Sequence, residues 1–172
     1  EIAKQRDTDE LTKLLTKNAI ERKIKRYMEL TPSKPAMMLV IDLDNFKHIN
    51  DTFGHAYGDA VLRLMGECIR SNFREDDYKG RFGGDEFVVF LPGIDDKQQV
   101  VTYVNNLVEM MKAHVRTPES ANPVHGSIGI ALYPKHASTY EELFKKADEA
   151  LYASKERGKD RYTFYISKEV LK

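Results

Sequence analysis

An apolar run at residues 36–41 constrains the fold most, because its six consecutive hydrophobic residues lead directly into two carboxylates, Asp42 and Asp44. A continuous run of this length predicts a strand over residues 36–43 that is buried on both faces of a sheet. Burying a carboxylate is costly unless a cation or several hydrogen-bond donors satisfy it. The sequence therefore predicts a central strand that ends at a charged site.

Periodic patterns elsewhere predict the elements that surround this strand. Apolar residues at helical spacing predict helices over residues 11–28, 61–69, 100–111 and 139–151. A hairpin around Gly83-Gly84 and two further strands are predicted over residues 78–91, 127–133 and 161–166. A hairpin set among helices predicts an α/β (α+β) domain with a mainly antiparallel central sheet flanked by helices.

Size and charge limit the classes of protein to which the chain can belong. Its 172 residues suit a single domain, and 41% hydrophobic residues exclude a disordered chain. The 27 basic and 27 acidic residues balance, so no bulk attraction to nucleic acid or to an anionic membrane is expected. Any anionic ligand must be held by a local cluster of charges.

The single cysteine and the chain start bear on the cellular setting. Cys68 has no partner for an internal disulfide, in keeping with a reducing compartment, so we expect a cytoplasmic domain. The chain opens at Glu1 rather than Met and carries no secretory signal. We interpret it as a piece of a longer protein, which can be tethered to a membrane through another part.

A second acidic group follows a glycine turn, in Gly83-Gly84-Asp85-Glu86. If the hairpin lies beside the first strand, Asp42 and Asp85 converge on one point. Hard oxygen ligands of this kind suit Mg²⁺, and two such ions would serve an in-line phosphoryl or nucleotidyl displacement. The alternative is structural, with Asp44 as a helix N-cap and Asp85-Glu86 as an ordinary acidic turn.

Four spaced motifs together resemble the GGDEF family of diguanylate cyclases. They are Asp9-x-Leu11-Thr12, the acidic segment of residues 42–59, the Gly83-Gly84-Asp85-Glu86-Phe87 turn, and Ala147-Asp148-x-Ala150-Leu151-Tyr152. The resemblance covers nearly the whole chain. We expect residues 9–172 to form the GGDEF domain and residues 1–8 to be the end of an upstream signalling helix or linker.

The resemblance implies a fold similar to nucleotidyl cyclase and polymerase palm domains. It also implies condensation of two GTP molecules into cyclic di-GMP with release of two pyrophosphates. The expected cofactor is Mg²⁺, with Mn²⁺ as an alternative. Each subunit of a homodimer would hold one GTP, and an upstream sensor would bring the two loaded sites face to face. Alone, we expect the domain to be mostly monomeric and slow.

The same resemblance assigns the metal site and the base. Asp42, the Leu43 carbonyl and Asp85 would hold Mg²⁺. Asp85, or Glu86 beside it, would help to deprotonate the attacking 3′-hydroxyl. These assignments place the reaction at the end of the central strand.

Phosphate contacts are expected at two places. Backbone amides near Asn45 and Phe46 would contact phosphates, and Lys47 would offset charge that develops at the α-phosphate. Lys155 and Lys159, one helical turn apart at the close of the last helix, would contact the β- and γ-phosphates. The alternative for these two lysines is a solvated basic face favoured by the helix C-terminus.

The sequence departs from the usual family pattern in two places. Gly158-Lys159-Asp160 replaces a frequent Gly-Arg-Asn. Lysine offers a point charge instead of a fork, and Asp160 adds a like charge for phosphate, so we expect weaker nucleotide affinity without loss of chemistry. Residues 13–18 replace a commoner Gly-Leu-x-Asn-Arg, which alters the geometry before the first helix and leaves the metal site untouched.

Asn50 and Asp59 are the expected readers of guanine. A carboxylate can accept hydrogen bonds from the N1–H and the exocyclic amine of guanine, which adenine does not offer in that pattern. Asp59 should therefore discriminate against ATP. His55 lies between them and is expected near the base or ribose, with a structural hydrogen bond within the Gly54–Gly58 loop as the alternative.

Arg74-Glu75-Asp76-Asp77 lies just before the glycine turn, at the spacing of the family's RxxD inhibitory site. There the product would bind away from the active site, with Arg74 forking onto a phosphate or guanine edge and Asp77 accepting from guanine. Arg81 lies on the same approach and could assist. The alternative is a charge cluster that ends a helix.

Two other functions compete with a diguanylate cyclase. One is a non-catalytic receptor for cyclic di-GMP or GTP, although the intact acids at Asp42, Asp85 and Glu86 count against it. The other is a nucleotidyl cyclase with a mixed or mononucleotide product, which Asn50 and Asp59 disfavour. Mass spectrometry of the products formed from GTP or ATP with Mg²⁺ separates the three.

Overall fold

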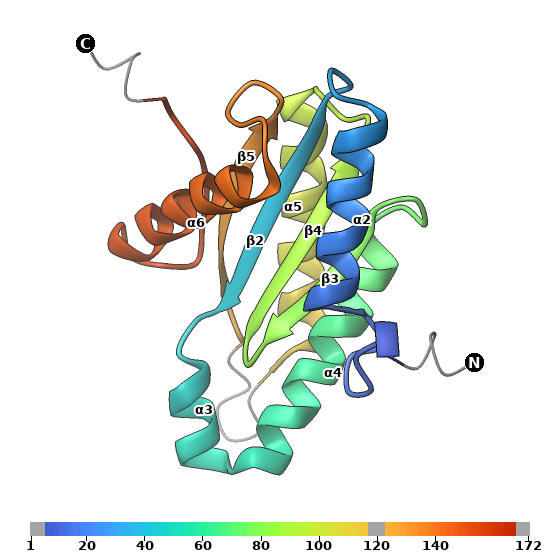
Figure 1. Ribbon diagram of the computed structural model, residues 1–172. Helices are drawn as coiled ribbons and strands as arrows, with labels where there is room; N and C mark the ends of the chain where they lie inside the picture. Colours follow the sequence, from blue (N-terminus) through green and yellow to red (C-terminus); the bar gives the residue numbers. More distant parts are fainter. Residues whose placement is uncertain (1–5, 117–122, 168–172) are drawn as a thin grey trace.

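A six-stranded sheet forms the middle layer of the computed structural model, which describes residues 6–116 and 123–167 (Figure 1). The strands lie in the order β1-β3-β4-β2-β5-β6. Their bounds are β1 Leu15–Thr16, β2 Ala36–Leu43, β3 Tyr78–Gly83, β4 Glu86–Pro92, β5 Gly126–Tyr133 and β6 Tyr162–Phe164. The inner pairings are antiparallel, and only the two short edge strands pair in parallel with their neighbours. The predicted, mainly antiparallel sheet is confirmed.

Helices cover both faces of this sheet. They are α2 Lys17–Leu30, α3 Phe46–Phe53, α4 His55–Asn72, α5 Lys97–His114 and α6 Tyr140–Glu156. α2 and α6 pack on one face, α4 and α5 pack on the other, and α3 lies beyond the end of β2 (Figure 1). Within the described residues, no helix is long and apolar enough to cross a membrane.

Strand β2 separates two hydrophobic layers. Met37, Leu39 and Ile41 face the layer of α4 and α5, whereas Met38 and Val40 face the layer of α2 and α6. All five side chains are fully buried. Because successive residues of a strand point to opposite faces, only an unbroken apolar run can fill both layers. The prediction of a strand buried on both faces is confirmed, with the predicted bounds.

Helix α6 begins directly after Thr139, the first residue of the helix predicted over residues 139–151. Thr139 is the N-cap, and its side chain accepts a hydrogen bond of 3.2 Å from the backbone N–H of Glu142. This bond satisfies one of the free N–H groups at the helix start. A capping threonine therefore fixes the position of α6, the helix that carries Lys155.

The first helix is shorter than predicted, because it begins at Lys17 rather than at residue 11. Residues 9–14 form a turn, since the Asp9 carboxylate accepts hydrogen bonds from Thr12 and competes with helical bonding. β1 follows, and its pairing with β3 was not predicted. Residues 1–5 and 168–172 lie outside the described residues, so much of the predicted linker at residues 1–8 does too.

Two further elements differ from the sequence prediction. Helix α3 was not predicted, because its few buried side chains, among them Phe46 and Ile49, are separated by polar residues. The last strand covers only Tyr162–Phe164 rather than residues 161–166. Helix α3 follows β2 directly, at the end of the sheet at which the predicted site gathers.

Candidate functional site

The predicted metal ligands meet where β2 ends and β4 begins. Asp42 lies opposite Glu86 in the antiparallel pairing, and the Leu43 N–H donates a 3.2 Å hydrogen bond to the carbonyl oxygen of Asp85. This pairing brings together two acidic segments that are distant in sequence. Asp42 and Asp85 therefore converge, as predicted from a hairpin beside the central strand.

Burial and like charge perturb the acids at this place. The pKa of Asp85 is raised to about 6, first because burial removes water and then because of the neighbouring Asp42 carboxyl. The pKa of Glu86 is also raised, by burial and by the charges of Asp148, Asp42 and Asp85. Clustered carboxylates that resist ionisation are typical of sites that bind a cation or move a proton.

A lysine of α6 compensates part of the negative charge of these acids. Lys155, in the last turn of α6, donates a hydrogen bond to Asp42 Oδ2. Burial lowers the pKa of Lys155, but the bond to Asp42 and nearby acidic charges outweigh it, so that the pKa is raised. The structure therefore places the Lys155 ammonium group against Asp42, one of the predicted metal ligands.

The donor set fits a hard divalent cation. Asp42 Oδ1 is buried and has no hydrogen-bond partner among the described residues, so this oxygen is available to a ligand. Within residues 6–116 and 123–167, no three His, Cys, Asp or Glu side chains form a ready-made metal cluster. Two carboxylates and a backbone carbonyl suit Mg²⁺, which keeps several positions for water and substrate phosphate.

Asp44 has a structural role instead. Its carboxylate is buried and accepts hydrogen bonds from Ser127 Oγ at 2.7 Å and from the Asp160 backbone N–H at 2.9 Å. The alternative of Asp44 as a helix N-cap is wrong, because Asn45 is the N-cap of α3 and makes no side-chain cap. Asp44 therefore ties the end of β2 to β5 and to the loop after α6.

That loop corrects the prediction for Lys159. α6 ends at Glu156, so Lys159 lies beyond the helix rather than one turn after Lys155 within it. Gly158, Lys159 and Asp160 all have positive φ angles, of 116°, 65° and 48°. Three successive left-handed residues reverse the chain, and the last two carry the backbone strain expected of non-glycine residues there.

The reversed loop carries Lys159 to the start of α3. Its Nζ donates a 2.9 Å hydrogen bond to Asn45 Oδ1. The Asp160 carboxylate lies 3.2 Å from His125 Nδ1. The predicted phosphate contacts at Lys159 and Asn45 are thereby held together. Asp160, which replaces the usual asparagine of the family, faces His125.

The remaining predicted phosphate contacts surround the N-terminus of α3. Asn45 has a left-handed φ of 59° and its side chain is exposed. Phe46 is buried against the core and anchors the helix. Lys47 is exposed and makes no ion pair among the described residues. The lysine is free to reach a ligand.

The predicted guanine readers lie on two adjacent helices. Asn50 is on α3, and its Oδ1 is buried without a partner among the residues described. It packs so closely on Gly58 that a Cβ at that glycine would lie 1.8 Å from Asn50 Oδ1. Asp59 is exposed on α4. Gly58, which directly precedes Asp59 on α4, therefore makes room for the side-chain amide of Asn50.

His55 is the first residue of α4, so the predicted loop between Gly54 and Gly58 is wrong. Gly54, with a φ of 92°, connects α3 directly to α4. The His55 side chain is exposed, and within the described residues it makes no side-chain hydrogen bond. The geometry gives no support to the structural alternative for this histidine.

The predicted inhibitory pair is already joined. Arg74 donates to Asp77 through Nε at 3.1 Å and Nη2 at 2.7 Å, and its backbone N–H donates to the same carboxylate at 2.8 Å. The Asp77 side chain is 0% exposed. Asp77 therefore serves as a buried anchor for Arg74, and could meet a ligand only if this pair opened.

Arg74 also lines a groove of about 930 Å³ beside α2 and β3. The groove is rich in basic side chains, which include Lys13, Lys23, Lys34, Arg70 and Lys79. Glu75, Asp76 and Asp77 line it too. The groove therefore offers several basic side chains to an anion, and its lining does not include Asp42, Asp85 or Glu86.

Arg81 does not join Arg74 and Asp77. Arg74 reaches the carbonyl of Pro92 at one end of the β3–β4 hairpin, whereas Arg81 binds the carbonyl of Gly84 at the other end. Arg81 also pairs with Asp9 at 3.4 Å. Its contacts belong to the glycine turn rather than to the groove.

Sequence reasoning missed residues that support the site. Asp148 lies on α6, and its charge raises the pKa of Glu86. It precedes Lys155 by seven residues, two helical turns, and this spacing could have placed it on the same face. Ser127 and His125 gave no comparable signal, because their partners lie far away in sequence.

The sequence is similar to a known family and to known proteins. The family model for the diguanylate cyclase GGDEF domain matches residues 6–161. Diguanylate cyclase DosC from Escherichia coli K12 is 38% identical over 157 residues, which cover 89% of this chain and 34% of DosC. The chain therefore spans about a third of the length of that relative.

Solved structures agree with this assignment. The GGDEF domain of TpbB from Pseudomonas aeruginosa has a TM-score of 0.85 at 34% identity, covering 92% of this chain and 94% of that one. The coiled coil and GGDEF domain of DgcB from Caulobacter crescentus, in complex with cyclic di-GMP, has a TM-score of 0.85 at 27% identity, covering 95% and 87%. By its matched length, its sequence and its fold, the chain belongs to the GGDEF family of diguanylate cyclase domains.

Proposed function

We propose that this domain condenses two GTP molecules into cyclic di-GMP and releases two pyrophosphates. The observation that carries the proposal is the meeting of Asp42 and Asp85, with Asp42 Oδ1 buried and unpartnered among the described residues. A buried, unsatisfied carboxylate oxygen beside a second carboxyl is costly unless a cation completes it. A nucleotide-bound divalent cation is such a partner.

Asp42, the Leu43 carbonyl and Asp85 would hold Mg²⁺, or Mn²⁺ in its place. The bound ion supplies charge neutralisation at the triphosphate. Asp85 or the adjacent Glu86 would accept the proton of the attacking 3′-hydroxyl. The 3′-oxygen then forms a bond to the α-phosphorus of the second GTP, and pyrophosphate leaves.

Positive groups around the acids would bind the triphosphate. Lys155 would leave Asp42 for the β- and γ-phosphates once a metal ion neutralises that carboxylate. Lys159 and the amides near Asn45 and Phe46 would contact phosphates, and Lys47 would offset charge at the α-phosphate. The contact between Lys159 and Asn45 supports this arrangement, because it preassembles two of these groups.

Asn50 and Asp59 would select guanine. The unpartnered Oδ1 of Asn50 and the exposed carboxylate of Asp59 are acceptors for the N1–H and exocyclic amine of guanine, a pair of adjacent donors that adenine does not offer. His55 would lie near the base or ribose. A buried acceptor left unpaired by the wrong base costs affinity, which gives the site its selectivity.

The reaction would need two copies of this chain. The described residues supply one set of guanine readers, so each subunit would hold one GTP, and a homodimer would place the two half-sites face to face. Residues 9–172 would form the catalytic domain, following a linker that ends near residue 8. An upstream sensor would control the pairing. We propose the cytoplasm as the location, in keeping with the free, buried Cys68.

Cyclic di-GMP would inhibit the enzyme at Arg74 and Asp77. Support comes from the basic groove that Arg74 lines and from the DgcB structure, which was solved with cyclic di-GMP. Because Asp77 is buried against Arg74, binding would require the pair to separate. Arg81 would take part only if the contacts that hold it at Gly84 were broken.

The test is to incubate the protein with GTP and Mg²⁺ and to identify products by mass spectrometry. We expect cyclic di-GMP and pyrophosphate from GTP, no cyclic product from ATP, and no product from Asp85→Asn. Asp95→Asn, which removes an exposed acid just before α5, is the matched control and should stay active. Binding of GTP or cyclic di-GMP without turnover would instead favour a non-catalytic receptor.

A further inference from the structure

The turn at residues 9–14, which precedes α2, is closed by its own hydrogen bonds. The Asp9 backbone N–H donates to the Leu14 carbonyl at 2.7 Å, and the Lys13 N–H donates to the Asp9 carbonyl at 2.8 Å. Asp9 Oδ2 accepts from the Thr12 N–H at 2.9 Å and from Thr12 Oγ1 at 2.7 Å. These bonds make the turn a compact unit rather than a loose linker.

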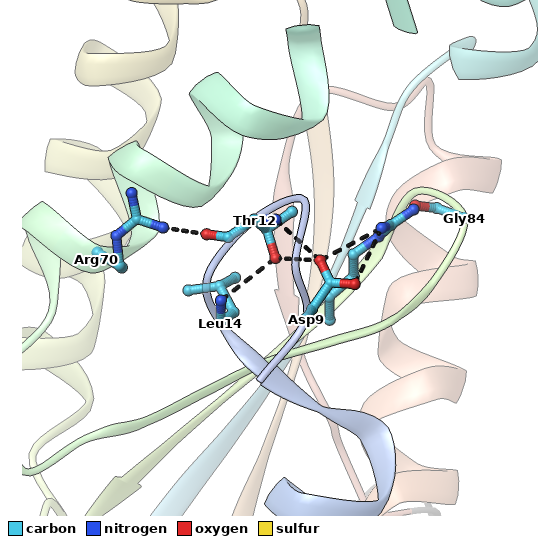
Figure 2. Close-up of polar contacts among 6 residues, drawn as sticks. Asp9, Thr12, Leu14, Arg70 and Gly84 are labelled. Atoms are coloured by element: carbon cyan, nitrogen blue, oxygen red, sulfur yellow. Dashed lines mark hydrogen bonds and ion pairs between the residues drawn. The ribbon is translucent and has the colours of Figure 1, made fainter. Parts of the chain in front are cut away.

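Arg81 joins this turn to the glycine turn of the hairpin, through Asp9 on one side and Gly84 on the other, which are both labelled in Figure 2. Its Nη1 lies 3.4 Å from both carboxylate oxygens of Asp9. Its Nε and Nη2 donate to the Gly84 carbonyl at 3.1 and 3.0 Å. The Arg81 side chain is only 16% exposed, and its contacts with Asp9 are partly buried. One guanidinium therefore bridges Asp9 and the residue that precedes Asp85.

Backbone pairing holds the two ends of the glycine turn, through the β3–β4 ladder and the bond from the Leu43 N–H to the Asp85 carbonyl. Gly83 and Gly84 have positive φ angles of 124° and 52°, and a Cβ added at either would meet nothing within 4 Å. A turn of two open glycines has no side chains of its own to pack and wide backbone freedom. The fork of an arginine, with donors in fixed directions, suits the task of fixing one carbonyl against one carboxylate.

The turn at residues 9–14 is also anchored on its other side. Arg70 of α4 donates a hydrogen bond to the Thr12 carbonyl, as Figure 2 shows. Gly66 of the same helix leaves room for Thr12, because a Cβ there would lie 2.8 Å from the Thr12 carbonyl oxygen. The turn therefore touches α4, which carries Asp59, and the hairpin, which carries Asp85. It connects two of the elements that build the site.

We propose that Arg81 is a positioning residue, through which the turn at residues 9–14 sets where the Asp85 carboxylate lies relative to Asp42. The inference rests on the proposed cyclase function. Within the described part of the chain, Arg81 makes no hydrogen bond or ion pair to a residue assigned to metal or GTP, so it acts through the Gly84 carbonyl. A displacement of the turn would shift Asp85 without any contact to the substrate.

The test compares Arg81→Met, Arg81→Lys and Asp9→Asn in the full chain, with kcat and the KM for GTP measured separately. Arg81→Met should lower kcat roughly tenfold to a hundredfold, because small misplacements of reacting groups are costly, while KM changes by less than about threefold. Arg81→Lys should recover part of the loss. Arg22→Met is the matched control, because Arg22 pairs with Asp7 nearby at 2.6 Å on the surface, and it should leave kcat unchanged.

Coupling between the two turns has its own prediction. If Asp9 acts through Arg81, the double variant Asp9→Asn/Arg81→Met should lose no more kcat than Arg81→Met alone. Hydrogen–deuterium exchange gives a readout that needs no activity. In Arg81→Met, amide exchange should rise at residues 83–86, whereas in Arg22→Met it should match the wild type there.

Three results would overturn the proposal. They are an unchanged kcat in Arg81→Met, a loss of kcat that matches the loss of folded protein, and unchanged exchange at residues 83–86. If Arg81→Met raised the inhibition constant for cyclic di-GMP and left kcat unchanged, Arg81 would instead belong to the inhibitory site predicted from the sequence. If the wild type forms no product while exchange responds as expected, the cyclase function fails and the link between the turns stands.

Discussion

The Lys155 ammonium group, at the end of α6, binds Asp42 Oδ2 across 113 residues of sequence. The other oxygen of Asp42 has no partner among the described residues. The lysine thus balances one charge of a cluster that contains Asp42, Asp85 and Glu86. Removing an acid and removing the lysine should therefore have opposite effects on stability.

Asp85→Asn should abolish cyclase activity, by at least about a hundredfold, because it removes a metal ligand and a candidate base. The free energy of unfolding at pH 8 should be unchanged or higher, since the variant relieves like-charge repulsion with Asp42. Product formation and urea denaturation measure the two effects. A variant that unfolds more easily than the wild type would contradict the electrostatic account of this cluster.

Lys155→Met should act in the opposite direction. The variant keeps much of the aliphatic stem but leaves the Asp42 carboxylate without its cation, so the free energy of unfolding should fall by about 1–3 kcal/mol at pH 8. Added Mn²⁺ should restore part of that stability, because the ion can replace the ammonium charge. Lys145→Met on the exposed face of α6 is the control. Equal stabilities of the two variants would refute the balancing role.

Asp160→Asn should improve GTP binding. The change removes a negative charge beside Lys159 but keeps the backbone N–H that donates to Asp44. Because the pair of Asp160 and His125 is largely exposed, the free energy of unfolding should change by less than about 0.5 kcal/mol. The KM for GTP should fall by about twofold to threefold, as expected for a weakly screened charge near phosphate. A higher KM would show that the acid helps to hold the loop for binding.

Arg74→Ala should weaken product inhibition and also destabilise the domain. The Asp77 carboxylate would remain buried without its guanidinium partner, at a cost of about 3 kcal/mol. The double variant Arg74→Ala/Asp77→Asn should regain part of that stability, because the buried charge is gone. Both variants should need more cyclic di-GMP for half-inhibition of initial rates. An unchanged inhibition constant in a folded variant would remove Arg74 from the inhibitory site.

His136 should make stability depend on pH. Burial and nearby Lys135, Lys97 and Lys146 lower its pKa to about 4, and its Nδ1 accepts a 2.9 Å hydrogen bond from the Leu132 N–H. Between pH 6.5 and 4 the unfolded chain binds a proton that the native chain does not. Stability from this group is therefore full above pH 6.5 and falls toward pH 4, by at most about 3 kcal/mol.

His136→Asn is the matched variant, because its amide oxygen can accept the Leu132 N–H bond without titrating. Urea denaturation at pH 7.5 and pH 5 measures the difference. The wild type should lose more stability between these values than the variant does. Equal losses would mean that other groups account for the pH dependence.

How much of the fold was predictable is clearest from β2 and α3. The strand was predicted with its bounds because six apolar residues in a row can satisfy only a doubly buried position. Helix α3 gave no such signal, because it packs few side chains and its chain path depends on the left-handed Asn45 and on Gly54. Local periodicity carries no information about such irregular backbone.

The candidate site, like the fold, was predictable only in part. Asp42 and Asp85 could be paired from the sequence, because a hairpin beside a strand brings the two acids together. The contacts of Lys159 and Arg81 could not be predicted, since each depends on tertiary structure: a reversed loop in one case and the turn at residues 9–14 in the other. Motifs identified candidate residues, whereas side-chain partners required the fold.

Asp42 and Asp44, two residues apart, show how strictly this chain must align its strands. One carboxylate lies in the acidic cluster, and the other secures Ser127 and Asp160. A slip of β2 by one residue against β5 would turn both side chains out of their places at once. Insertions and deletions should therefore be tolerated in distant loops and be lethal to function within the last residues of this strand.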